Sequence, residues 1–324
     1  MRLFQQILSI DSTSGKEREL GLFLAHRLKA ERVELLEVGD GTVNLFLSWG
    51  QPKIVYCTHM DTVPPYIPPR FEQERVWGRG SCDAKGQIYA MYQACQRLSE
   101  AGKSDFGLLL LSGEETGSFG AKAFAKTSFR APYLVVGEPT DNCLVSASKG
   151  TRSYSLRFKG KAFHSGYPEM GTSAVELFVD FVNRLRAADF PEDPVLGKTS
   201  YNVGALHSDN PQNILSPELC CRVYFRTTFA AESAVEAFMK AQTSESLEVQ
   251  ALGGDQARNY YTIEGLPSKV VSFGSDAPHL SNFEHKMICG PGSIKVAHRD
   301  DEHIEIKDIE IAIENYIKIY ESCN

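Results

Sequence analysis

The amino-acid sequence predicts an α/β protein with a central, largely parallel sheet flanked by helices, interrupted by an inserted α+β domain. Two observations support this prediction. Toward both ends of the chain, short apolar runs typical of strands buried on both faces alternate with amphipathic helical segments. The middle of the chain instead has the order strand-helix-strand-strand-helix-strand, which is typical of ferredoxin-like folds. We therefore expect a larger domain formed by residues 1–148 and 253–324, and an inserted domain formed by residues 149–252.

The larger domain begins with a predicted helix. Ser14 followed by Glu17 indicates a capping box, and leucines at helical spacing follow it. A later helix is expected to end before Gly102, a typical helix stop. Continuous apolar runs predict the strands, which are expected at 43–49, 54–57, 106–111, 133–136 and 286–289. That helix is expected at 87–98, and the last one at 306–320.

The inserted domain is recognised by a change of pattern. Residues 154–159 alternate apolar and polar side chains, as a strand with one buried face does. Further strands are expected at 201–206, 219–227 and 247–251. The two helices of this domain are expected at 172–187 and 231–242.

Composition excludes several classes of protein. The chain has 324 residues, of which 42% are hydrophobic, and a formal net charge of -7. It has no basic run that would indicate nucleic-acid binding, and no apolar stretch approaching the roughly 18 residues of a membrane span. The N-terminus lacks the long apolar core of a secretory signal. Its eight cysteines are scattered without a CxxC pair, so we expect reduced thiols and a cytoplasmic protein.

Histidines and carboxylates follow four of the predicted strands, close to where each strand ends. Ligands of open α/β sheets bind beyond the carboxyl ends of the strands, so these side chains should converge. A single such residue is more often a helix cap or a surface residue, but several carboxylates packed together would repel one another without a cation. The converging residues are His59, Asp61, Asp83, Glu114, Glu115, Glu138 and His298.

This residue set favours two metal ions. Imidazole and carboxylate ligands suit zinc, or another transition metal such as cobalt or manganese. Five ligands are too many for one tetrahedral site with an open position, but they suit a pair of ions bridged by one carboxylate.

The adjacent pair Glu114 and Glu115 indicates how such a site could catalyse hydrolysis. Neighbouring side chains of near-extended chain point to opposite sides, so one glutamate can bind metal while the other faces the substrate as a free base. Taken alone, the pair would equally fit an exposed acidic turn. Asp61 lies two residues from His59 on the same side of extended chain, where it can bond the second ring nitrogen.

Five segments of the chain resemble motifs of the M20 family of metallopeptidases and deacylases. They lie at 58–64, 78–86, 112–117, 137–140 and 290–302, in the family's order and across nearly the whole chain. The family includes acetylornithine and acetylcitrulline deacetylases, succinyl-diaminopimelate desuccinylase, aminoacylases and several dipeptidases. The resemblance therefore implies a metal-dependent hydrolase of amide bonds.

The resemblance also implies specific roles for the converging residues. His59, Asp83 and Glu138 would hold one divalent ion, and Asp83, Glu115 and His298 the other, with Asp83 bridging. Glu114 would be the general base and acid, and Asp61 would orient His59. Zinc is the metal expected first, and cobalt is the alternative.

For the inserted domain, the resemblance implies a lid that also forms a homodimer. His164 would reach a neighbouring active site and stabilise the tetrahedral intermediate, and Asn213 and Arg226 would contact the substrate. From the residues alone, His164 is only a loop histidine and Arg226 fits a surface ion pair equally well.

The segments 274–278 and 290–298 resemble acetylornithine deacetylases most closely. This predicts a deacetylase of arginine biosynthesis that releases acetate from N-acetylornithine or a similar small N-acyl amino acid. The alternatives are an M20 dipeptidase or aminopeptidase, a deacylase for N-acetylcitrulline or N-succinyl-diaminopimelate, and a relative without catalysis.

Overall fold

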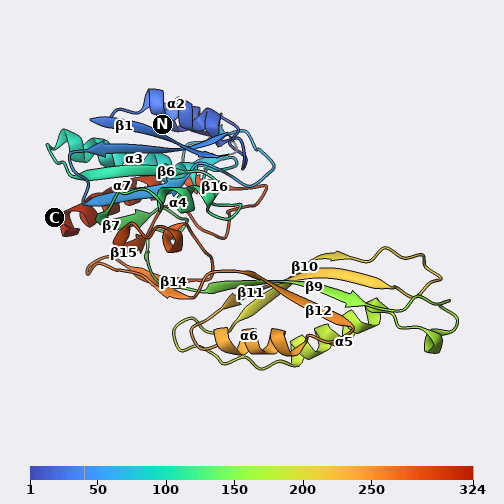
Figure 1. Ribbon diagram of the computed structural model, residues 1–324. Helices are drawn as coiled ribbons and strands as arrows, with labels where there is room; N and C mark the ends of the chain where they lie inside the picture. Colours follow the sequence, from blue (N-terminus) through green and yellow to red (C-terminus); the bar gives the residue numbers. More distant parts are fainter. Residues whose placement is uncertain (40, 324) are drawn as a thin grey trace. The chain divides into compact units, whose positions relative to one another are not determined.

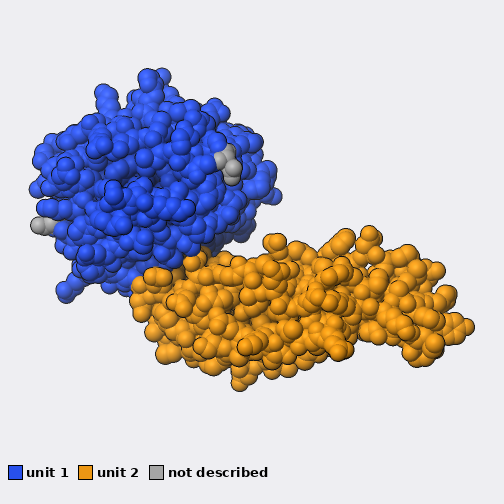
Figure 2. Space-filling model, viewed as in Figure 1, with its two compact units in different colours: residues 1–146, 260–269, 275–324 blue, residues 147–259, 270–274 orange. Residues whose placement is uncertain are grey.

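The computed structural model describes residues 1–39 and 41–323, and the chain divides into two compact units (Figure 2). Unit 1 comprises residues 1–146, 260–269 and the segment from residue 275 onward. Unit 2 comprises residues 147–259 and 270–274. Unit 2 is therefore longer than the predicted inserted domain, 149–252, since it also includes residues 253–259 and a short return segment.

Unit 1 is built around a six-stranded sheet of order β1-β2-β6-β3-β7-β15 (Figure 1). The four strands β6, β3, β7 and β15 run parallel, and β2 and β1 add an antiparallel pair at one edge. This is the predicted α/β sheet. The strands are β1 (Arg32–Gly39), β2 (Thr42–Trp49), β3 (Ile54–His59), β6 (Phe106–Leu111), β7 (Ala131–Val136) and β15 (Phe283–Ile288).

Helices cover both faces of this sheet, because its strands are apolar on both sides. In β2, Leu45 and Leu47 join a core cluster that includes residues of four helices, while Phe46 points the opposite way, toward Phe124 of α4. The four helices of the larger cluster are α1 (Arg2–Leu8), α2 (Glu17–Arg27), α3 (Lys85–Glu100) and α7 (Ile306–Cys323), whereas α4 spans Phe119–Phe124.

Buried tyrosines tie α7 to the parallel strands. The Tyr56 hydroxyl of β3 donates to the Tyr316 carbonyl of α7 (2.7 Å), and the Tyr316 hydroxyl donates to the Cys289 carbonyl just after β15 (3.0 Å). Both tyrosines are fully buried, so these hydrogen bonds satisfy groups that have no access to water. They fix the strand ends from which the candidate site is built.

Unit 2 has the predicted ferredoxin-like order. Its antiparallel sheet has the strand order β10-β11-β9-β12, and α5 and α6 lie on the same side of it (Figure 1). Alternate residues of β9 and β11, such as Phe158 and Phe225, pack against these helices. The elements are β9 (Gly150–Lys159), α5 (Ala174–Ala187), β10 (Ser200–His207), β11 (Glu218–Thr227), α6 (Glu232–Ala241) and β12 (Leu247–Gly253).

The remaining elements are short. One small sheet has the order β16-β5-β4 and another the order β13-β8-β14. Among the described residues, no helix is both long and apolar enough to cross a membrane. The short elements are β4 (Arg70–Phe71), β5 (Arg75–Trp77), β8 (Leu144–Ser148), β13 (Arg258–Asn259), β14 (Ser268–Val271), β16 (His303–Glu305), η1 (Pro168–Met170) and η2 (Ala277–His279).

The predicted capping box before α2 is wrong. The N-cap residue is Lys16, with no side-chain cap, and the Ser14 hydroxyl instead donates to Asp61 Oδ2 (2.9 Å). Glu17 turns back to accept a hydrogen bond from the Gly15 amide (3.0 Å). Ser14 therefore supports the candidate site rather than the helix.

Candidate metal centre

The parallel strands bring the predicted residues to one edge of the sheet. His59 is the last residue of β3, and its neighbours β6 and β7 are followed by Glu114, Glu115 and Glu138. Parallel strands end on the same side, so residues distant in sequence meet there. Asp83 reaches this edge from the loop before α3, which begins at Lys85.

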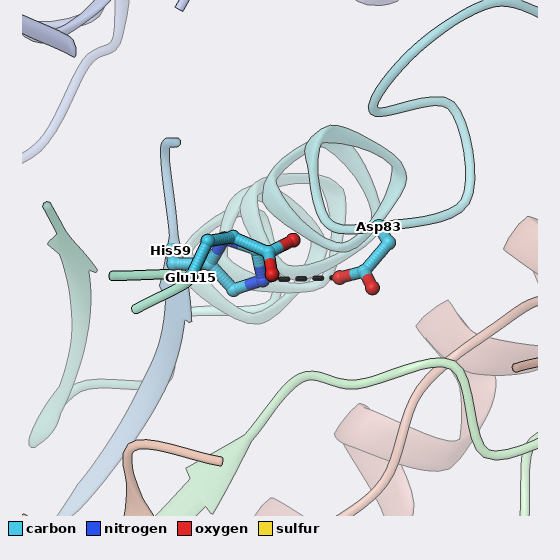
Figure 3. Close-up of side chains that lie close together, drawn as sticks. All are labelled: His59, Asp83 and Glu115. Atoms are coloured by element: carbon cyan, nitrogen blue, oxygen red, sulfur yellow. Dashed lines mark hydrogen bonds and ion pairs between the residues drawn. The ribbon is translucent and has the colours of Figure 1, made fainter. Parts of the chain in front are cut away.

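Asp83 lies between two imidazoles. Its Oδ1 is 3.0 Å from His59 Nε2, and its Oδ2 is 3.3 Å from His298 Nε2. His298 Nε2 is also 2.9 Å from Glu115 Oε1. Ligand atoms of His59, Asp83 and Glu115 lie within 4.8 Å of one another, and Figure 3 shows Asp83 facing His59. A carboxylate whose two oxygens face different imidazoles is arranged as a bridge between two cations would be.

The pKa values of these groups reflect their close packing. Burial alone would raise the pKa of Asp83, but the imidazoles of His298 and His59 hold it well below its usual range. Burial opposes charge on His59 as well, yet Asp61 and Asp83 raise its pKa well above the usual value. Asp83 and Glu115 raise the pKa of His298 to about 10. Protonated imidazoles thus supply the positive charge that these carboxylates need.

Glu138 is a further buried carboxylate beside these groups, and it fits a divalent cation. Glu138 is 4% exposed, and its Oε1 has no hydrogen-bond partner among the described residues. Burial, together with the charge of Glu114, raises the pKa of Glu138 well above its usual value. A buried carboxylate oxygen without a partner is costly. A metal ion held by imidazole and carboxylate would remove this cost, so the residues present suit the predicted metal.

Glu114 has the environment expected of a proton carrier. Burial raises its pKa well above the usual value, and the nearby carboxylates of Asp276 and Glu115 add to that shift, against the opposing effect of His59. A carboxyl group whose pKa is raised by its surroundings holds a proton more readily than a solvent-exposed glutamate, as a general base and acid must.

Asp61 organises the turn that carries both glutamates. Its Oδ1 accepts the Glu114 amide and its Oδ2 accepts the Glu115 amide, both at 3.1 Å. His59 Nδ1 is 2.9 Å from the Asp61 carbonyl and 3.4 Å from Asp61 Oδ1. The structure thus places Asp61 beside the second ring nitrogen of His59, and it adds contacts to the glutamate turn that the sequence did not indicate.

His298 sits on a strained turn. Its φ is 63°, a left-handed conformation that costs free energy in residues other than glycine. Its side chain is 48% exposed, unlike the buried His59. Such a conformation persists only when surrounding contacts hold it.

His164, Asn213 and Arg226 belong to unit 2. His164 is exposed and its Nδ1 accepts the Gly166 amide (3.1 Å), while the next residue, Ser165, donates its amide to the Asn213 carbonyl (2.9 Å). The Arg226 guanidinium lies 5.0 Å from the centre of the Tyr224 ring. The catalytic role of His164 and the substrate contacts of Asn213 and Arg226 stay predictions.

Sequence reasoning did not single out two buried acids of unit 1. Burial raises the pKa of Asp276 to about 6, and its charge in turn raises the pKa of Glu114 and Glu138. Glu302 is 1% exposed and paired with Arg79. Both acids lie in segments matched to family motifs, but the motif match alone gives them no role.

Known proteins resemble this chain over nearly its full length. The model of peptidase family M20/M25/M40 matches residues 55–322. A probable carboxypeptidase of Aspergillus flavus is 30% identical, with 98% of this chain and 86% of that protein covered. A tripeptidase from Staphylococcus aureus has a similar fold (TM-score 0.82, 20% identity, 99% of this chain and 97% of that chain). So does an M20 family metallo-carboxypeptidase from Sulfolobus solfataricus (TM-score 0.77, 15% identity, 99% and 98%).

The family match extends through every strand that ends at the candidate site, from β3 to β15. The Aspergillus relative independently reaches 30% identity over almost the entire chain. The chain therefore belongs to peptidase family M20/M25/M40, and it is a metal-dependent hydrolase that acts on amide bonds.

Proposed function

We propose that this enzyme uses two divalent metal ions to cleave the amide bond between an acyl group and the amine of a small amino acid. The observation that supports this most is the environment of Glu114. It is a carboxyl group with a raised pKa, adjacent in sequence to Glu115, which belongs to the group of candidate metal ligands. A closed structural metal site would have no use for such a free carboxyl group.

Asp83 would bridge the two ions. His59 and Glu138 would complete one site, and Glu115 and His298 the other. Zinc fits these ligands best, and cobalt is the second candidate. The ions would polarise the amide carbonyl and lower the pKa of the attacking water toward 7.

The protein's own contribution is proton transfer and positioning. Glu114 would take a proton from the attacking water and later deliver it to the leaving amine nitrogen. Asp61 would keep this glutamate in place through the two backbone amides that it holds.

Two substrate classes remain candidates, and both contain the same kind of bond. The segments 274–278 and 290–298 favour N-acetylornithine, as in a deacetylase of arginine biosynthesis. The names of the related carboxypeptidase and tripeptidase favour short peptides. In either case the amide nitrogen belongs to an amino acid that is released with a free amine.

A hydrolysis screen tests this proposal. Protein loaded with zinc or with cobalt would be incubated with N-acetylornithine, N-acetylcitrulline, N-succinyl-diaminopimelate and several dipeptides, and the new amines would be measured. We expect metal-dependent cleavage with N-acetylornithine preferred. If a dipeptide is cleaved in preference, the proposed substrate is wrong but the proposed mechanism stands. If metal-loaded protein cleaves none of these compounds, the proposal is contradicted and a relative without catalysis is favoured.

We further propose that unit 2 acts as a lid, in which Asn213 and Arg226 contact the substrate and His164 stabilises the tetrahedral intermediate of a neighbouring active site. Arg226 can form paired hydrogen bonds with a carboxylate, which an N-acyl amino acid carries. Changing Arg226 to Lys should therefore raise KM about 10-fold or more with less effect on kcat. An unchanged KM would remove Arg226 from the substrate site.

Unit 2 is also the proposed dimerisation surface. Strand β10 lies at the edge of its sheet and is largely exposed, and Val175 and Val179 of α5 are 37% and 43% exposed. An open edge strand is a ready template for pairing with a second copy. Sedimentation should show a dimer.

We also propose a cytoplasmic location, where the eight unpaired cysteines would stay reduced.

A further inference from the structure

One buried ion pair connects the two loops that carry Asp83 and His298. Arg79 and Glu302 are each 1% exposed, and Arg79 Nη1 donates to Glu302 Oε2 at 2.5 Å. Both residues lie in segments that resemble family motifs, but neither is a metal ligand or a proton carrier in the proposed reaction. A buried ion pair is by itself weak evidence for stability, so its other contacts must explain it.

Glu302 holds the loop that presents Asp83. Its Oε1 accepts three backbone amides, from Gly80 (2.9 Å), Cys82 (3.1 Å) and Asp83 itself (3.1 Å). The Glu302 carbonyl accepts a fourth amide, from Gly78 (3.0 Å). Three amides that converge on one charged oxygen fix the direction of the loop, because charge-assisted hydrogen bonds are the strong ones.

This loop has little freedom to adjust if that oxygen is lost. Gly80 has a φ of +82°, and a Cβ there would lie 2.9 Å from Thr62 Cγ2 and 3.0 Å from Lys85 Cδ. The backbone is therefore closely packed as well as hydrogen-bonded.

Arg79 extends the same network to the turn that presents His298. Its Nη1 also donates to the Arg299 carbonyl (3.1 Å), directly after His298, and its Nε donates to the Pro65 carbonyl (3.3 Å). His298 has the strained φ of 63°, which requires support from its surroundings. The Glu302 amide donates to the same Arg299 carbonyl (3.3 Å).

We propose that Arg79 and Glu302 are positioning residues that set the distance between Asp83 and His298 before metal binds. Asp83 and His298 each lie on a loop, and the hydrogen bonds of the ion pair hold these two loops at a fixed distance from each other. The inference deepens the proposed function, on which it rests. Groups behind the ligands in metal sites commonly change metal affinity about 10- to 100-fold when they are altered.

The test measures zinc affinity of the folded, metal-free protein by competition with a chelating dye. Glu302→Gln keeps the shape of the side chain but loses its charge, and should raise the Kd for zinc about 10- to 100-fold. Arg79→Lys keeps the charge but cannot donate in three directions from one planar group, so it should raise the Kd about 10-fold. If Glu302→Gln does not fold, the zinc Kd of Arg79→Lys still tests the proposal.

Glu305→Gln is the matched control. Glu305 is close in sequence and pairs with Arg75 at 2.5 Å, but that pair is less buried than Arg79–Glu302, because the Arg75 and Glu305 side chains are 46% and 23% exposed. We expect its Kd to stay within about 2-fold of wild type, as for most surface ion pairs.

The outcomes separate this inference from the proposed function. Folded Glu302→Gln and Arg79→Lys proteins that bind zinc as wild type does would overturn the inference alone, even if their metal-free forms melt at lower temperature, because that result would show a purely structural pair. A wild-type protein that binds no zinc would overturn the proposed function and the inference with it.

Discussion

Glu114 and Glu115 are adjacent in sequence, but they are proposed to do different chemistry. Glu115 Oε1 contacts His298 at 2.9 Å, whereas Glu114 has no such contact with an imidazole and has a strongly raised pKa. The same Glu→Gln substitution at these two neighbouring positions therefore distinguishes loss of the proposed base from loss of a proposed metal ligand.

Changing Glu114 to Gln should abolish most turnover and leave metal binding intact. Loss of a general base typically lowers kcat about 10²- to 10⁴-fold. The measurement is kcat at saturating substrate, with metal content determined on the same sample. Glu115→Gln is the matched variant and should lose metal as well as activity. Equal metal loss in both variants would show that Glu114 is a ligand and not the base.

For single residues, the sequence predicted the candidate metal ligands better than the hydrogen bonds that hold them in place. His59, Glu115 and His298 follow predicted strands, Asp83 precedes a predicted helix, and the structure brings all four together. The hydrogen bond from Ser14 to Asp61, and those from the glutamate turn to Asp61, could not be predicted, because they depend on how a turn folds back on another strand. Ser14 was assigned to a helix cap, since the local spacing is the same in both cases.

The turn after β6 shows how an element positions the site. Gly113 precedes Glu114 and has a φ of +73°, and a Cβ added there would lie 1.6 Å from a ring carbon of Phe119. Gly117, in the same turn, has a φ of +113°, but a Cβ there would meet nothing within 4 Å. Both glycines have a positive φ, but only at Gly113 would an added Cβ collide with a neighbouring side chain.

Gly113→Ala should therefore be much more harmful than Gly117→Ala. The positive φ alone costs roughly 1–2 kcal/mol in either variant, and displacing Phe119 should add about 1–3 kcal/mol at Gly113. The measurement is the free energy of unfolding in urea, together with kcat. We expect only Gly113→Ala to lower kcat strongly, since it moves Glu114. Equal losses in both variants would show that the Phe119 contact is unimportant.

Among the elements, buried strands were the easiest to predict. The strand predicted at 106–111 matches β6, because every one of its residues is apolar and buried. Strand β1 was not predicted, since it lies at the sheet edge and its residues alternate between exposed and half-buried. Helix α4 has only six residues, which is too short for a helical pattern to be recognised.

For the whole molecule, the sequence predicted the folds of both units. Continuous apolar strands alternate with helices in unit 1, whereas unit 2 has half-buried strands in the ferredoxin-like order. The limits of the inserted unit were less accessible, since residues 253–259 and 270–274 have no periodic pattern that assigns them to either unit. The substrate could not be fixed either, because the deacetylases and peptidases of this family share the metal ligands.

Removing metal should make stability depend on pH in a defined direction. Glu114 and Glu138 have pKa values raised above 4.5, so their contribution is present below that pH and is lost as pH rises through the raised values. The pKa of His59 is raised too, and that of His298 is about 10, so their contributions are also lost as pH rises above 6.5. Above about pH 6.5 all four groups act in the same direction, so the metal-free protein should lose stability as pH rises.

Zinc should reverse this trend, because its ligands bind in their deprotonated form. We therefore expect the difference in melting temperature between zinc-loaded and metal-free protein to be larger at about pH 8 than at about pH 5. Differential scanning calorimetry on both forms checks this. A difference that does not change with pH would mean that the three proposed ligands among these groups, His59, Glu138 and His298, do not form the zinc site.

The most direct measurement is the number of zinc ions bound per chain, by mass spectrometry of native protein. We expect two ions in wild type and one in His298→Ala, because His298 serves only one of the two proposed sites. A single ion in wild type, or two ions in the His298→Ala protein, would contradict the central claim that Asp83 bridges a pair of metals.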